Sequence, residues 1–389
     1  MDDAAAAFDP QMMFDFPDPY PMFAELRRTT PVHRIEMFGR ASWLVTRYDD
    51  VQAVLRDGDT FSSRANAEVG RFMGRTIIEM DGKEHTRTRA LVSTVFVPRA
   101  IDALVPVVER LVHELLDGIA PAGRADLVAQ LTTVFPVQVI AHIIGIPRTD
   151  TAKFMRWSLD LIGFARDPQK GRAAADILHE YFLPVIRERR AEPRDDVITR
   201  LVTGTVDGIG LTDDEVISFL RLLLPAGAET TSRLMGSMFF ALLADPETRL
   251  ERVRADRSLI PWAIEETLRW ETPVLFVARQ ATRPTAIAGV DLPAGEMVSA
   301  IIGSANRDET HYADPDRFDL DRHADDHLSF AFGRHFCLGS PLARLEARMA
   351  LTTVLDRLRN VRLDPDAEPP RITGLAFRSP QALRVRFDG

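Results

Sequence analysis

The chain of 389 residues has one cysteine, Cys337, and only three lysines. A single thiol cannot close a disulfide within the chain, so the fold does not depend on an oxidising compartment, and we expect a cytoplasmic protein. The start, MDDAAAAFDP, lacks a basic segment followed by an apolar one, which argues against a signal peptide. Apolar runs such as LLLPAGA at 222–228 are far shorter than the roughly 20 residues of a membrane span, so no membrane segment is expected.

Basic charge is also in deficit, because 48 Lys and Arg stand against 57 Asp and Glu, for a net charge of -9. This balance argues against nonspecific binding of nucleic acid. A hydrophobic content of 46% indicates a globular chain with a large core. Because no linker, repeat or low-complexity tract divides the sequence, we expect one domain over residues 1–389 and a monomer.

Most of the sequence shows helical periodicity of its apolar residues. Segments typical of β-strands are short and occur at 41–48, 285–300 and 381–388. The sequence therefore predicts a mainly α fold with small β-sheets. In the longest helix, PAGAETT at 225–231 predicts a kink or an opened turn, because Pro225 removes a backbone hydrogen bond. That helix begins with a capping box, TDDE. Apolar residues three and four apart predict helices over 101–117, 127–144, 173–190, 212–244, 260–270 and 342–358.

The lone thiol lies in SFAFGRHFCLGSP, residues 329–341, directly before a predicted helix. Oriented amides at a helix N-terminus favour a thiolate over a thiol. Gly333 and Gly339 allow the backbone to approach the sulfur and whatever it binds. On the residues alone, Cys337 fits either a reactive ligand position or a buried structural cysteine.

The spacing of Phe330, Gly333, Cys337 and Gly339 resembles the haem-binding loop of cytochrome P450 enzymes. The common bacterial loop has a second glycine where this chain has Ala331, and we expect alanine to fit there without strain. Other segments resemble the family in the expected order, so the resemblance covers nearly the whole chain. These segments are DPYPMFAELR (18–27), EHTRTR (84–89), AGAETT (226–231), EETLR (265–269) and DPDRFDLDR (314–322).

The resemblance implies the cytochrome P450 fold, a single haem domain with a long central helix. It also implies haem b as cofactor, with Cys337 as the metal ligand, because a thiolate donates the electron density that favours O–O cleavage. Haem propionates need cationic partners, although each such residue alone fits a solvated surface position equally. The cofactor-binding residues implied are His85, Arg89, Arg279, Phe330, Gly333, His335, Cys337 and Gly339.

Glu229 and Thr230 resemble the acid and alcohol pair of the family's central helix, which delivers protons. The Thr230 hydroxyl can also bond to the carbonyl of its own helix. Glu266 and Arg269 resemble a buried structural pair, completed by Arg317 or, less well matched, by Arg322. Their spacing alone equally fits an exposed i,i+3 pair.

Apolar positions predict a small apolar organic substrate, and the pocket residues implied are Leu222, Ala226, Val274 and Phe276. Arginines 64, 71 and 75 either anchor a substrate carboxylate or remain solvated. No GxGxxG follows a strand, so we expect electrons from a separate ferredoxin and its NAD(P)H-dependent reductase. We expect an acidic ferredoxin to dock on a basic face formed by Arg87, Arg99, Arg334 and Arg344.

The function predicted is a soluble bacterial-type monooxygenase that inserts one oxygen atom from dioxygen into its substrate. One alternative is a peroxygenase that takes hydrogen peroxide directly. Another is a haem-thiolate sensor that performs no chemistry. The pair Glu229 and Thr230 favours the dioxygen route over peroxide. It also argues against a sensor, which would have no need for a proton relay.

Overall fold

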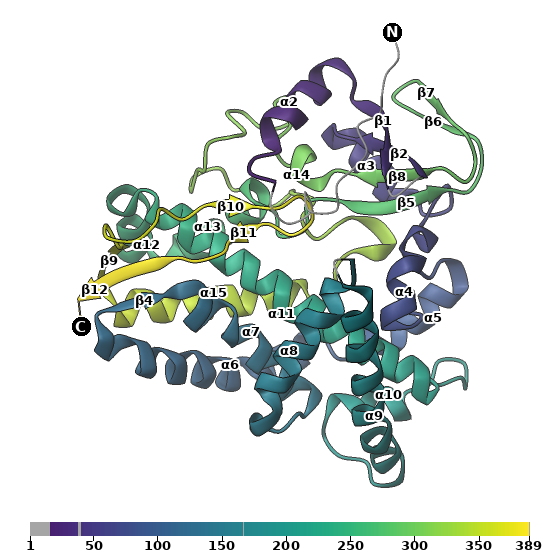
Figure 1. Ribbon diagram of the computed structural model, residues 1–389, viewed down its shortest axis with the longest axis horizontal. Coiled ribbons are helices and arrows are strands. Elements are labelled where there is room, and N and C mark those ends of the chain that lie inside the picture. The colour runs from purple at the N-terminus through teal and green to yellow at the C-terminus, as the bar shows by residue number, and fades with distance from the viewer. Residues whose placement is uncertain (1–15, 38–39, 166, 389) are drawn as a thin grey trace.

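The computed structural model describes residues 16–37, 40–165 and 167–388, so the acidic start of the chain lies outside the described residues. Figure 1 shows a β-rich part carrying α2, α3 and α14 above a larger helical part built around α11. The predicted mainly α architecture is confirmed. The helices are α2 (Tyr20–Thr29), α3 (Tyr48–Arg56), α4 (Ala67–Met73), α5 (Gly82–Ser93), α6 (Pro98–Ile119), α7 (Val134–Ile144), α8 (Thr151–Ile162), α9 (Pro168–Ala191), α10 (Val197–Thr203), α11 (Asp213–Leu243), α12 (Glu251–Ala255), α13 (Ile260–Trp270), α14 (Ile302–Ala305) and α15 (Ser340–Arg357).

The strands form small sheets, as predicted. The largest has the order β1-β2-β8-β5-β3, in which β2 and β8 pair in parallel and the other neighbours are antiparallel. A second sheet has the order β4-β12-β9, and two hairpins, β6-β7 and β10-β11, complete the set. The strands are β1 (Val32–Met37), β2 (Arg40–Val45), β3 (Phe61–Ser62), β4 (Arg124–Asp126), β5 (Val277–Ala281), β6 (Thr285–Ile287), β7 (Val290–Leu292), β8 (Met297–Ala300), β9 (Arg359–Leu363), β10 (Ile372–Thr373), β11 (Ser379–Pro380) and β12 (Arg384–Asp388).

The central helix α11 organises the helical part. Its capping box is formed by Thr212 and Glu215, as the sequence predicts. The helix runs from Asp213 to Leu243 without interruption, so the expected opened turn at Pro225 is not found. Helices α7, α9, α13 and α15 pack against it. Gly227 allows a close approach of α7, because a Cβ there would overlap the Ile140 side chain.

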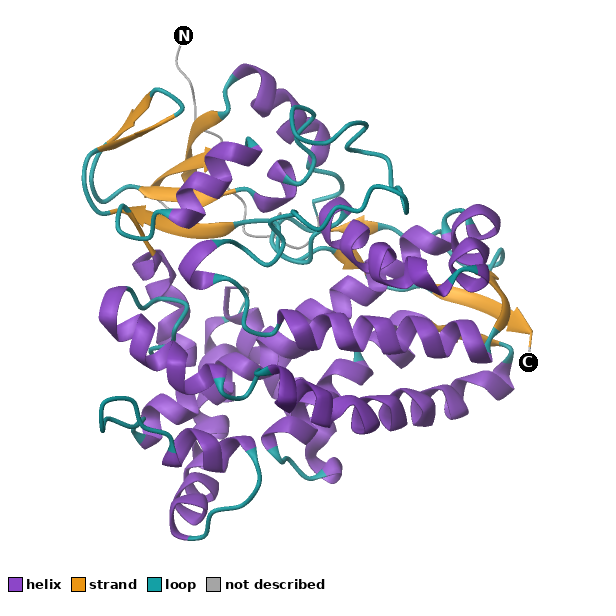
Figure 2. Ribbon diagram, turned by 180° about the vertical axis from the view of Figure 1, so that it is seen from behind, coloured by secondary structure: helices purple, strands orange, loops and turns teal. Residues whose placement is uncertain are grey.

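The two parts have separate hydrophobic cores. The larger core lies among the helices, and a smaller one joins the five-stranded sheet to α3, around Val45, Val51 and Val298. Figure 2 shows the same division from behind, with most strands gathered on the side away from the helical bundle. Among the described residues no single helix is long and apolar enough to cross a membrane; Gly82–Ser93 with Pro98–Ala122, bent by 44°, passes that test only as a pair and only on length and composition.

Candidate active site around Cys337

The loop that carries Cys337 is closed by its own backbone. The Cys337 N–H donates to the carbonyl oxygen of Phe330 at 2.9 Å, and the Phe336 N–H donates to that of Gly333 at 3.1 Å. Gly333 has φ +72°, and a Cβ on it would lie 3.0 Å from the carbonyl oxygen of Leu55 in α3. Both facts require glycine at this position. The loop is therefore a rigid turn packed against α3 that leads directly into α15.

Ala331 departs from the common loop at a strained position. Its φ is +58°, in the left-handed region, where a residue with a Cβ costs roughly 1–2 kcal/mol. The expectation that alanine fits without strain is wrong, because the turn needs positive φ there. Phe330, one residue earlier, is buried in the helical core with the Arg344 guanidinium 4.5 Å from its ring centroid. The packing of Phe330 in the core thus holds the strained turn at Ala331 in place.

The Cys337 side chain has accessible surface, although many protein atoms lie around it at longer range. This combination is typical of a group that faces an internal space. Burial raises the pKa of the Cys337 thiol, although the amides of Gly339 and Ser340 and the charges of Arg89 and Arg344 act in the opposite direction. The helix N-terminus therefore acts as predicted, but burial outweighs it. A metal cation deprotonates a coordinating thiol outright, so a bound metal would supply the stabilisation of the thiolate that the protein groups alone do not reach.

Four cationic or basic side chains converge beside this loop from three separate parts of the chain. The rings of His85 and His335 lie 4.2 Å apart between centroids. Arg89 donates to the carbonyl oxygen of Phe336 at 2.6 Å. Arg279, only 4% exposed, donates to the carbonyl oxygen of its neighbour Ala278 at 2.8 Å. The structure thus brings together the four residues that the sequence analysis singles out for propionates.

The electrostatics of this cluster test whether a haem fits. Burial lowers the pKa of all four groups, to about 10 for Arg279 and to about 3 for His335. The buried Nε2 of His85 has no hydrogen-bond partner among the described residues. Within them Asp81 is the one carboxylate at ion-pair distance, 3.9 Å from His335. Such a cluster suits an added dianion, so the two carboxylates of a haem fit.

The predicted relay residues lie on adjacent positions of α11. Thr230 Oγ1 donates to the carbonyl oxygen of Ala226 at 2.7 Å, which leaves its lone pairs able to accept a hydrogen bond. Glu229 forms an ion pair with Arg233, one turn further along the helix. Arg233 is a residue that the sequence did not predict, although its i,i+4 spacing from Glu229 is a signal for an ion pair on a helix.

The predicted pocket residues share one property: each keeps exposed surface and has at least one fully buried chain neighbour. Ala226 is exposed in the middle of α11, between buried Pro225 and half-buried Gly227. The other three, Leu222, Val274 and Phe276, are half-buried.

Two of the three arginines offered as substrate anchors have partners of their own. Arg71 pairs with Glu68 at 2.9 Å, and Arg75 pairs with Glu84 at 2.6 Å, whereas Arg64 is exposed. The charges of Arg71 and Arg75 are thus already matched within the chain.

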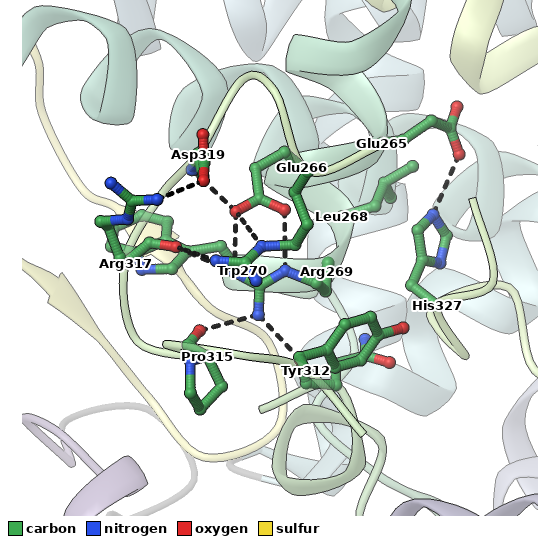
Figure 3. Close-up of polar contacts among 12 residues, drawn as sticks. Glu265, Glu266, Leu268, Arg269, Trp270, Tyr312, Pro315, Arg317, Asp319 and His327 are labelled. Atoms are coloured by element: carbon green, nitrogen blue, oxygen red, sulfur yellow. Dashed lines mark hydrogen bonds and ion pairs between the residues drawn. The ribbon is translucent and has the colours of Figure 1, made fainter. Parts of the chain in front are cut away.

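Behind the loop, Glu266 and Arg269 form a buried pair on α13, with side chains 1% and 0% exposed. The carboxylate is held bidentately, at 2.7 Å from Arg269 Nε and 2.8 Å from Nη2. Arg269 also donates to the carbonyl oxygens of Asn306, Pro315 and Arg317, which places all five of its N–H groups in hydrogen bonds. Figure 3 shows this arrangement. The exposed-pair alternative does not hold.

The prediction that Arg317 completes this pair is wrong for its side chain. That side chain is 63% exposed and pairs with Asp319 at 2.5 Å. Arg322 instead donates from Nε to Glu266 at 3.2 Å and from Nη2 to the carbonyl oxygen of Asp314 at 3.0 Å. Arg317 contributes only its backbone, because the turn at 314–317 directs its side chain to solvent.

The predicted basic face is largely neutralised within the chain. Arg344 holds Glu265 bidentately at 2.7 Å, and together with His327 it lowers the pKa of that carboxyl to about 2, although burial opposes the shift. Arg334 pairs with Asp59 at 2.7 Å, and Arg87 lies 3.9 Å from Glu215. Arg99 is exposed. The face therefore carries less net positive charge than its sequence suggests.

Comparison with known proteins identifies the family. The family model for cytochrome P450 matches residues 13–150 and 137–384. The cytochrome P450 monooxygenase PikC from Streptomyces venezuelae is 37% identical over 357 residues, covering 89% of this chain and 85% of PikC. Mycinamicin IV hydroxylase/epoxidase from Micromonospora griseorubida is 37% identical over 93% of this chain and 94% of its own. The structure of PksS, a cytochrome P450 of the Bacillus subtilis 168 bacillaene polyketide synthase, gives a TM-score of 0.90 at 32% identity, covering 98% of this chain and 100% of that one.

These matches show that the chain belongs to the cytochrome P450 family. It is an enzyme, a monooxygenase of the oxidoreductase class, and the predicted fold is confirmed. Family membership implies a haem-iron cofactor, a small organic substrate and a redox partner.

Proposed function

We propose that this protein uses haem b, dioxygen and electrons from a ferredoxin and its reductase to insert one oxygen atom into a small apolar organic substrate. We further propose that residues 1–389 are one haem domain. The observation that carries the proposal is the convergence of Cys337 with the basic side chains of His85, Arg89 and Arg279 beside one rigid loop. A thiolate-ligated haem supplies the activation of dioxygen that such an insertion needs.

The protein residues would divide the remaining tasks among themselves. Cys337 Sγ is proposed as the iron ligand, and the amides of Gly339 and Ser340 would hold its charge. His85, Arg89, Arg279 and His335 would hold the propionates. Glu229 would pass protons from water toward the Thr230 hydroxyl, whose lone pairs can accept while its own hydrogen bonds to the helix.

The substrate is proposed to contact Leu222, Ala226, Val274 and Phe276. All four are apolar, and all four keep exposed surface where they lie. An apolar organic molecule would cover that surface with the hydrophobic gain of about 25 cal/mol per Å² removed from water. Of the three arginines suggested as anchors, Arg71 and Arg75 are paired with glutamates, whereas Arg64 is exposed and forms no ion pair with the described residues. We propose no substrate contact for any of the three.

Electrons are proposed to come from an acidic ferredoxin that docks on the Cys337 side of the haem. Arg99 and Arg334 are the exposed arginines of the predicted face, and Arg334 shares its charge with Asp59. Because so much of this charge is paired internally, we expect only a shallow salt dependence of the electron-transfer rate.

The test begins with the reduced holoprotein and carbon monoxide. Thiolate ligation gives a red-shifted Soret band, and the Cys337→His variant should lose it while a haem is still bound. Retention of that band in the variant would overturn the ligand assignment. Screening a compound library for Soret shifts then identifies a substrate, and oxygenated product must depend on NADH, ferredoxin and reductase with catalase present. Product formed from peroxide alone would instead establish the peroxygenase, and a bound compound without product would establish the sensor.

A further inference from the structure

Arg233 joins the proposed relay acid to a separate segment of the chain. Its side chain and that of Glu229 are each 17% exposed, so the ion pair is shielded from most solvent. From Nη1, Arg233 donates to the carbonyl oxygen of Phe377 and to Ser379 Oγ, both at 3.2 Å. The guanidinium also lies over the Phe377 ring, 5.6 Å from its centroid. One planar group therefore contacts both α11 and the loop between β10 and β11.

That loop adjoins the proposed substrate pocket. Phe377 forms a β-bridge with Val274, and the Leu275 N–H donates to the carbonyl oxygen of Ala376 at 3.0 Å. Phe377 is half-buried, as Val274 is. A molecule that contacts Val274 thus contacts a segment whose backbone is hydrogen-bonded to the loop. The loop is hydrogen-bonded in turn to Arg233.

The guanidinium is what makes this connection rigid. It is flat and its donors have fixed directions. A movement of the two oxygens that accept from Nη1 therefore also moves Nη2, which donates to Glu229. The order of the pair, with the acid one turn before the base, is the favourable one on a helix. Lysine would keep the charge beside Glu229, but a single ammonium on a flexible stem could not fix both contacts together.

We propose that Arg233 is a positioning residue that couples the Phe377 loop to Glu229, so that occupancy of the pocket is transmitted to the acid of the proton relay. This proposal rests on the proposed function, because it takes Glu229 as the relay acid. Coupling is reciprocal, so the state of Glu229 must also change the affinity of the pocket for its occupant. That consequence can be measured by binding alone, without turnover.

The experiment is a double-mutant cycle on the holoprotein, read from Soret shifts. The probes are a bulky triphenylmethyl imidazole, which ligates iron and also fills the space above it, and imidazole itself, which only ligates iron. Glu229→Gln should change the Kd of the bulky probe about fivefold or more in the wild-type background and leave it unchanged in Arg233→Met. Imidazole should show no such dependence.

Two further variants keep the outcome decisive. Arg233→Lys should abolish the coupling as Met does, whereas full retention with lysine would reduce Arg233 to a charge partner and overturn the proposal. Arg221→Met is the matched control, because Arg221 is also on α11 but donates to the carbonyl oxygen of Ala175 in α9. It should leave the effect of Glu229→Gln intact.

The outcomes separate this inference from the proposed function. Equal effects of Glu229→Gln with and without Arg233, in protein that shows the thiolate Soret band, would overturn the coupling alone. Peroxide released per NADH oxidised that is unchanged in Glu229→Gln would remove Glu229 from the relay, whatever the cycle shows.

Discussion

Two glutamates are buried equally deeply in this protein and are treated in opposite ways. Glu266 on α13 is 1% exposed and accepts hydrogen bonds from Arg269, from Arg322 and from the Asp319 N–H at 2.8 Å. Glu346 on α15 is 0% exposed, and among the described residues neither of its carboxylate oxygens has a hydrogen-bond partner. One site is full of donors, and the other has none in the described chain.

This difference decides the charge of each group. A buried carboxylate remains ionised only where donors and cations replace water, and otherwise it takes a proton. Burial raises the pKa of Glu346 well above its usual range, because no donor or cation of the described chain replaces the lost water. Residue type and depth therefore do not fix the charge of a buried glutamate; the supply of partners does.

The site around Glu266 should fail most severely when its main cation is removed. Arg269→Ala leaves a buried carboxylate with one remaining arginine and strips donors from three carbonyl oxygens. We expect a loss of about 3–5 kcal/mol in the free energy of unfolding, and little haem-loaded protein. Urea unfolding of the holoprotein and the absorbance ratio of haem to protein measure both. A variant with normal haem content and stability would show that the pair contributes no more than an exposed one.

The next largest effect separates the two arginines of the 314–322 segment. Arg322→Ala removes one donor to Glu266 and donors to backbone carbonyls, and should cost about 1–3 kcal/mol. Arg317→Ala is the matched control five residues away, and should stay within about 0.5 kcal/mol because its side chain is mostly exposed. The reverse order in urea unfolding would mean that Arg317, not Arg322, supports Glu266.

The sequence predicted the parts of this site that follow from periodicity and local rules. The helix over 260–270 was predicted from its apolar spacing and carries Glu266 and Arg269, and the capping box fixed the start of α11. The choice between Arg317 and Arg322 depended on the path of an irregular turn, which no period encodes. The left-handed φ of Ala331 was not predicted for the same reason, since it depends on the path of a folded turn.

Glu346 was missed for a different physical reason. A glutamate within an apolar helix pattern, as in LARLEARMAL, is ordinarily read as solvent-facing. Its burial follows from packing of α15 against α6, α11 and α13 together, which is a tertiary property.

A third effect, a change in the pH dependence of stability, is expected at Glu346. Its folded pKa lies above the unfolded value of about 4.3, so its stabilising contribution is fully present below pH 4.3 and is lost as pH rises. Above that pH the unfolded chain releases a proton that the folded protein keeps. Each further unit then lowers the free energy of unfolding by about 1.4 kcal/mol, until the folded pKa is passed.

Glu346→Gln keeps the shape of the neutral acid and removes its titration. Between pH 5 and pH 8 the free energy of unfolding of the wild type should fall relative to that of the variant by up to about 1.4 kcal/mol per unit, as measured by urea unfolding of the two holoproteins at matched ionic strength. Glu346→Met, apolar and similar in volume, should unfold no more easily than the wild type at pH 7, because it replaces an unpartnered polar group. Parallel pH profiles for the wild type and the Gln variant would place an ionised carboxylate in the bundle, and the two glutamates would no longer differ in charge.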